Sequence, residues 1–105
     1  MKRLEHLLFI LAEECAEVAH CASKAARFGP DEVEPGQEHT NMARIYQKFN
    51  DVCAVWRLLA LEHKMPLGFN FDAIIAKQYE IQKYLSHSTL AAARRGNNAP
   101  PTPLP

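Results

Sequence analysis

The sequence lacks the features of several functional classes. Its 12 basic and 12 acidic residues leave no net charge, so no excess of one sign attracts nucleic acid or an anionic membrane. No apolar run reaches the roughly 18 residues that a transmembrane helix needs. Acids follow the short apolar run of "MKRLEHLLFIL", where a signal peptide has small residues before its cleavage site. We therefore expect a cytoplasmic protein without nucleic-acid or membrane partners.

A Gly-rich phosphate loop and a paired-cysteine motif are also missing. The four glycines stand far apart in the chain, so no loop of the nucleotide-cradling kind is present. The three cysteines, Cys15, Cys21 and Cys53, form no CxxC pair and fall in apolar, helix-like surroundings. This pattern favours buried, reduced thiols, with a zinc site or a structural disulfide as the alternatives.

Helical periodicity dominates the first part of the chain. Apolar residues recur every three or four positions over residues 4–28, and Gly29 and Pro30 then end the pattern. Two neighbouring lines of this helix are candidates for burial. One consists of Leu4, Leu8, Leu11, Cys15, Val18, Ala22 and Ala25, and the other of Leu7, Ile10, Glu14, Glu17, Cys21, Lys24 and Phe28.

More helices are expected after the polar loop "PDEVEPGQEH". Thr40 can cap a second helix to about residue 63, whose buried line is Ile45, Phe49, Val52, Trp56 and Leu59. Asn70 can cap a third helix over 71–87, which turns inward Ile74, Ile75, Ile81 and Leu85. The stretch "TLAAARR" can form a short fourth helical piece.

These elements predict an all-α fold with one domain, residues 1–95. Two long antiparallel helices would form the centre of a helical bundle. Four prolines in the last six residues predict a flexible tail over residues 96–105. An apolar content of 48% is more than three or four helices can bury alone, so we expect a homo-oligomer, most simply a dimer.

The stretch "LAEECAEVAH", residues 11–20, places three carboxylates in a helix that otherwise looks buried. Glu14 and Glu17 share one face, about 5–6 Å apart at Cβ, and Glu13 lies at its edge. Asp51 is on an inward line of the second helix, so antiparallel pairing would bring four acids together. A hard divalent cation is the usual partner of such a cluster. The alternative is a solvated acidic face with partners on its own helix.

A family resemblance rests on these acids. The stretches "LAEECAEVAHCASKAARFG" and "NMARIYQKFNDVCAVWRLL" together resemble the MazG-like, all-α nucleoside triphosphate pyrophosphohydrolases, most of all the small forms of bacteria and phages. The resemblance covers residues 4–88. The family signature is EExxE on one helix and ExxD on the next. It is matched by Glu13, Glu14, Glu17 and Asp51, and the chain departs from it at Lys48, where the family has a glutamate.

The resemblance implies a reaction and a metal. It implies Mg²⁺-dependent hydrolysis of a nucleoside triphosphate between the α and β phosphates, with Mn²⁺ as a substitute ion, giving a monophosphate and pyrophosphate. Glu14, Glu17 and Asp51 would be metal ligands. Glu13 would act beside Glu14 in catalysis, as a further ligand or as the base for the attacking water. It also implies a dimer or a dimer of dimers, working in the cytoplasm of a bacterial cell or phage-infected host.

Other polar and aromatic residues are candidates for substrate binding. Each also has a plain structural explanation, such as a solvated face, a helix-end charge or a core position. Lys24, Arg27, Lys77 and Lys83, with Tyr84, could hold phosphates; Asn50 could touch a metal-bound water; Trp56 and Phe28 could stack on a base.

Two functional hypotheses differ in the effect that they assign to Lys48. Its ammonium has no lone pair for a metal, so it either weakens the metal site or snorkels outward and leaves room for the ion. The first hypothesis is therefore a pyrophosphohydrolase that Lys48 weakens. The second is a degenerate, non-catalytic helical module of the same fold that binds a nucleotide or a protein. Di-iron and Ser-His-Asp sites are not supported, because the second helix has no ExxH and no strained nucleophile turn is present.

Overall fold

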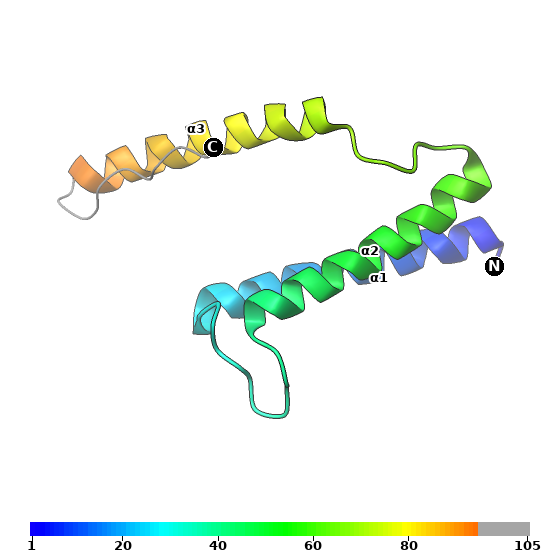
Figure 1. Ribbon diagram of the computed structural model, residues 1–105, viewed down its shortest axis with the longest axis horizontal. Helices are drawn as coiled ribbons and strands as arrows, with labels where there is room; N and C mark the ends of the chain where they lie inside the picture. Colours follow the sequence, from blue (N-terminus) through cyan, green and yellow to red (C-terminus); the bar gives the residue numbers. More distant parts are fainter. Residues whose placement is uncertain (95–105) are drawn as a thin grey trace. The chain divides into compact units, whose positions relative to one another are not determined.

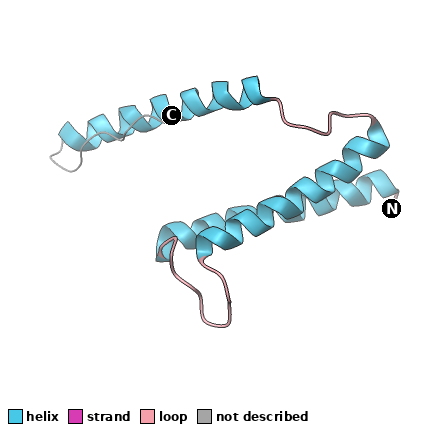
Figure 2. Ribbon diagram, viewed as in Figure 1, coloured by secondary structure: helices cyan, strands magenta, loops and turns pink. Residues whose placement is uncertain are grey.

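A computed structural model of the chain describes residues 1–94, and only the helical backbone for residues 88–94. In that range it contains three helices and no strand: α1 (Arg3–Phe28), α2 (Asn41–His63) and α3 (Phe71–Arg94) (Figure 2). The expected all-α class is confirmed. No described helix has an apolar stretch long enough to cross a bilayer. The tail expected over residues 96–105 lies outside the described residues.

The helix ends follow the expected capping chemistry. Thr40 Oγ1 accepts a hydrogen bond of 3.1 Å from the Ala43 N–H at the start of α2, and Asn70 Oδ1 accepts one of 3.0 Å from the Ala73 N–H at the start of α3. Each bond satisfies a donor that the first helical turn leaves unpaired. α1 ends at Gly29, whose φ of 106° suits glycine because glycine has no Cβ.

The chain divides into two compact units, Met1–Leu67 and a second that begins at Gly68. The second unit contains α3. The helical piece expected in "TLAAARR" is continuous with α3 up to Arg94, because no glycine or proline separates the two. The side chains expected to point inward are exposed, and the described part of their unit contains no second helix to cover them: Ile74, Ile75, Ile81 and Leu85.

The first unit is an antiparallel hairpin of α1 and α2 (Figure 1). Each helix turns toward the other a line of buried or half-buried residues in alternating steps of four and three. On α1 the line is Leu7, Leu11, Glu14, Val18, Cys21 and Ala25, and on α2 it is Asn41, Ile45, Lys48, Val52, Val55 and Leu59. This is the spacing of a coiled-coil interface, and we call the two lines together the seam.

The seam is apolar at one end and polar in its middle. Leu7, Val55 and Leu59 form the buried core, with Ile10, Leu11 and Trp56 packed against it. Glu14 and Lys48 occupy central seam positions, where both side chains are half-buried. The centre of the seam therefore carries charged side chains where the rest of it carries mostly apolar ones.

The two flanks of the seam differ in chemistry. One flank, the ion-pair flank, joins the helices through Arg3 with Glu62, Glu17 with Lys48, and Lys24 and Arg44 with Glu34; it also carries Leu58, which is exposed. Helical periodicity places on the opposite side an apolar flank of exposed residues: Leu4, Leu8, Cys15, Ala22, Met42 and Phe49. Four candidates for burial on the first helix are therefore exposed: Leu4, Leu8, Cys15 and Ala22. Phe49, expected on the buried line of the second helix, is exposed too.

Candidate functional site

The acids predicted from the sequence lie at different depths. Glu14 is half-buried on the seam, whereas Glu13 is exposed. The side chains of Glu17 and Asp51 are each 53% exposed. The expectation of deeply inward carboxylates is therefore met in part by Glu14 alone, and water solvates much of the negative charge.

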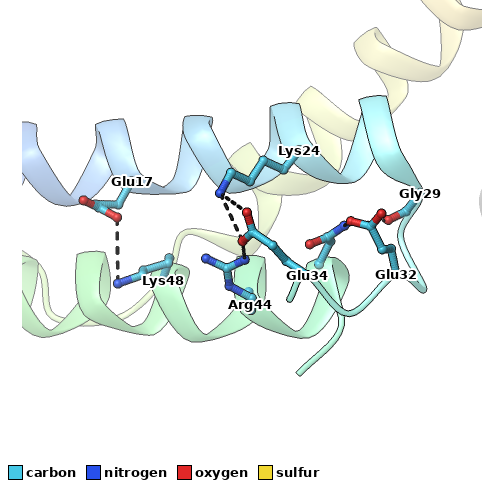
Figure 3. A network of polar contacts seen from close by, with 8 residues as sticks. Glu17, Lys24, Gly29, Glu32, Glu34, Arg44 and Lys48 are labelled. Carbon is cyan, nitrogen blue, oxygen red and sulfur yellow. Dashed lines mark hydrogen bonds and ion pairs between the residues drawn. The ribbon is translucent and has the colours of Figure 1, made fainter. Parts of the chain in front are cut away.

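Lys48 links the acids of the two helices. Its Nζ lies 3.8 Å from Glu17 Oε2 on α1 and 4.0 Å from Asp51 Oδ2 one turn along α2, and Figure 3 shows it reaching toward Glu17. The alternative, in which the acids find partners on their own helix, does not describe Glu17, because the ion-pair partner of Glu17 is Lys48 on the facing helix. At these distances and exposures such pairs contribute little to stability. The relevance of this arrangement to function is that it places the positive charge of the Lys48 ammonium next to two carboxylates.

The surroundings of Lys48 show which residues could hold a metal ion between α1 and α2. In the part of the chain that the structure describes, no three His, Cys, Asp or Glu side chains gather closely enough to hold a metal. Two carboxylates from facing helices do surround one cationic group, and the Lys48 ammonium stands in for a cation there. Mg²⁺ is commonly held by one or two carboxylates, waters and substrate phosphates. If the Lys48 side chain turned outward, as long charged side chains can, Glu17 and Asp51 would offer two carboxylates to one such ion.

A second charged cluster closes the loop end of the hairpin. Glu34, from the loop between α1 and α2, accepts bonds from Lys24 Nζ at 2.9 and 3.1 Å and from Arg44 Nη1 at 2.7 Å (Figure 3). Hydrogen bonding from these two residues, Lys24 first and then Arg44, lowers the pKa of Glu34. Sequence reasoning missed Glu34 and Arg44, although Arg44 lies four residues before Lys48 on the same helix face.

The base of this loop is fixed separately, around Asn41. Its side chain is buried, and its Nδ2 donates to Gly29 O at 2.9 Å and to Glu32 Oε1 at 3.2 Å. The backbone N–H groups of Asn41 and Met42 donate to Glu32 O and Pro30 O. These bonds pair the first donors of α2. Within the described chain, Asn41 Oδ1 is buried without a hydrogen-bond partner.

The other predicted substrate-binding residues do not join these clusters. Arg27 lies over the ring of Phe28, with 5.1 Å between its Cζ and the ring centroid. Asn50 is exposed on α2. Lys77 pairs with Glu80 at 3.2 Å within the second unit, where Lys83 and Tyr84 are exposed.

Trp56 and Phe28 differ in their surroundings. Trp56 packs against the core and its Nε1 donates to Pro66 O at 3.0 Å, as expected for a structural tryptophan with a satisfied N–H. Phe28 is exposed at the end of α1, so its ring contributes little to the hairpin core.

Comparison of the chain with protein-family models, with curated proteins and with solved structures gives no match. Three features of the hairpin bear on function: the acids around Lys48, the cations around Glu34, and the apolar flank.

We expect Glu34 to make the stability of the hairpin depend on pH in the acid range. Its pKa in the folded chain lies below the ordinary value of 4.5, so the stabilisation by Lys24 and Arg44 is fully present above that value. The free energy of unfolding should fall as pH drops below 4.5 and through the lower folded pKa. Denaturant titrations of the wild type and Glu34→Gln over a pH series measure this.

The stability difference between the wild type and Glu34→Gln should shrink on acidification, because the wild-type carboxyl then becomes neutral too. Glu38→Gln, at an exposed acid of the same loop, is the control and should differ little from the wild type. A wild-type advantage over Glu34→Gln that stays constant into the acid range would contradict the prediction.

Proposed function

We propose that this chain is a Mg²⁺-dependent nucleoside triphosphate pyrophosphohydrolase of the MazG-like type, with a metal site weakened by Lys48. The observation that carries the proposal is the convergence of Glu17 and Asp51, from two facing helices, on one positive charge at 3.8 and 4.0 Å. The order of acids along the chain, with its resemblance to EExxE and ExxD, supports the same assignment.

The proposal gives the acids distinct roles. Glu17 and Asp51 would hold the metal, and Glu14 would join them from its seam position. Exposed Glu13 would accept a proton from the attacking water. When bound, Mg²⁺ supplies charge neutralisation at the phosphates and a lower pKa for the attacking water. Lys24 would bind outer phosphates, which leave as pyrophosphate after attack at the α phosphate.

A non-catalytic module is the second candidate, and a specific observation favours it. Lys48 already compensates Glu17 and Asp51, and the described residues contain no group of three metal-binding side chains. In this case the hairpin would bind a nucleotide or a protein partner without hydrolysis. The two candidates differ in a single measurable property, which is pyrophosphate release that requires a divalent ion.

The proposal includes a cytoplasmic homodimer or dimer of dimers. The apolar flank supports it, since Leu8, Phe49 and Met42 are 48%, 46% and 55% exposed. Exposed apolar residues that follow a seam at helical spacing are typical of helices that pack against further helices. A second copy would cover this flank with an identical one, as a two-fold interface does.

Lys48→Glu should raise Mg²⁺ affinity and pyrophosphate release together. The change removes a positive charge and supplies a carboxylate beside Glu17 and Asp51, and we expect Mg²⁺ to bind at least about tenfold more tightly, ~1.4 kcal/mol. Calorimetric titration with Mg²⁺ and a pyrophosphate-release assay over a panel of dNTPs measure the two effects.

Two variants control this experiment. Lys48→Met removes the charge without adding a ligand, so it should give a smaller gain than Lys48→Glu. Arg57→Glu makes the same charge change at an exposed position of α2 and should have little effect. Rapid wild-type hydrolysis that Lys48→Glu leaves unchanged would contradict a metal site at this position. Absence of hydrolysis in both proteins would favour the non-catalytic module.

A charge on the apolar flank should weaken self-association. Sedimentation velocity of the wild type at micromolar concentration should give about twice the chain mass of 11.9 kDa. Leu8→Glu should raise the dimer dissociation constant at least about tenfold, since burying the new carboxylate is costly. Leu61→Glu, at an exposed leucine of α2 away from the seam and the flank, should leave it unchanged. A monomeric wild type would rule out this use of the flank.

A further inference from the structure

Two cations from opposite helices meet on one carboxylate at the loop end of the hairpin. Lys24 of α1 contacts both carboxylate oxygens of Glu34, and Arg44 of α2 contacts one of them. The side chains of Lys24 and Arg44 are only 23% and 15% exposed, and that of Glu34 is 34% exposed. Partial burial strengthens the electrostatic interactions of all three groups relative to those of solvated ions.

The charges of this cluster do not cancel. Lys24 and Arg44 carry two positive charges against the single negative charge of Glu34, which leaves one positive charge uncompensated within the cluster. Without an anion between them, the two cations would repel each other across the helix interface. An oxyanion with more charge and more oxygens than a carboxylate would satisfy them better, because guanidinium and ammonium groups bind phosphate through several charge-assisted hydrogen bonds.

Glu34 can leave this place without dismantling the hairpin. The loop base is held by bonds that do not involve it, between Asn41 and Gly29 and between Asn41 and Glu32. Glu34 itself starts a turn in which the Gln37 N–H donates to its carbonyl oxygen at 2.9 Å, and Gly36 in that turn has a φ of 87°. The segment that carries the carboxylate is therefore a small turn, separate from the anchored base.

We infer that Lys24 and Arg44 form a binding site for a phosphate oxyanion, which Glu34 occupies as an internal competitor. An incoming phosphate or pyrophosphate group displaces the carboxylate, and the turn around Gly36 moves with it. The inference rests on the proposed function for the identity of the natural ligand, the outer phosphates of a nucleoside triphosphate. In this site Arg44, and not the Arg27 predicted from the sequence, binds the phosphate together with Lys24.

Binding of inorganic pyrophosphate in the absence of divalent ions tests this inference. Glu34→Gln removes the competitor's charge, so it should bind pyrophosphate at least about tenfold more tightly than the wild type. Glu38→Gln changes the net charge equally on the same exposed loop and should bind like the wild type. The double variant Glu34→Gln with Lys24→Gln should lose the gain. Calorimetry gives the dissociation constants.

A second measurement uses the wild type, which keeps the test valid even if the variants fold poorly. In NMR titrations with pyrophosphate, amide signals of the turn at 34–37 should shift, whereas those near Leu7 and Leu59 should not. Equal affinities for Glu34→Gln and Glu38→Gln, or wild-type shifts that avoid the turn, would overturn the inference. The assay contains neither metal nor a hydrolysable ligand, so its outcome is independent of the hydrolysis proposed for Glu17 and Asp51.

Discussion

The seam between α1 and α2 is the constraint on which the rest of the hairpin depends. Its steps of four and three residues fix which side chains face each other, as in a coiled coil. The apolar end, with Leu7, Val55 and Leu59, holds the helices together. The same spacing puts two charged residues, Glu14 and Lys48, at the centre of the seam. Lys48 pairs there with Glu17 and Asp51, and these residues form the candidate site.

In both charged clusters, a side chain of one charge lies between two side chains of the opposite charge. At Lys48 an internal cation compensates acids, and at Glu34 an internal anion compensates bases. Partly exposed ion pairs contribute little free energy. Under the two proposals, a divalent cation would take the place of the Lys48 ammonium at one cluster, and a phosphate would take the place of the Glu34 carboxylate at the other.

Most helix boundaries could be predicted from local sequence signals. Thr40, Asn70 and Gly29 act as caps or stops through short-range chemistry, so the helix starts and the end of α1 were foreseeable. The residues of α1 that face α2 were harder to predict. Two adjacent lines of α1 are both largely apolar, and only the packing against α2 determines which residues are buried. The Glu34 cluster was missed because a loop carboxylate has no periodicity and its partners lie ten residues away in the chain.

The central claim is that Glu17 and Asp51 form a cation site in which Lys48 now stands. The most direct measurement is an NMR titration of the isotope-labelled wild type with Mn²⁺, which takes the oxygen ligands of Mg²⁺ and broadens nearby signals. The account predicts that amides around Glu14, Glu17 and Asp51 broaden first and that excess Mg²⁺ reverses the effect. Broadening that begins at other acids, such as Glu38 or Asp72, or no broadening at millimolar Mn²⁺, would contradict it.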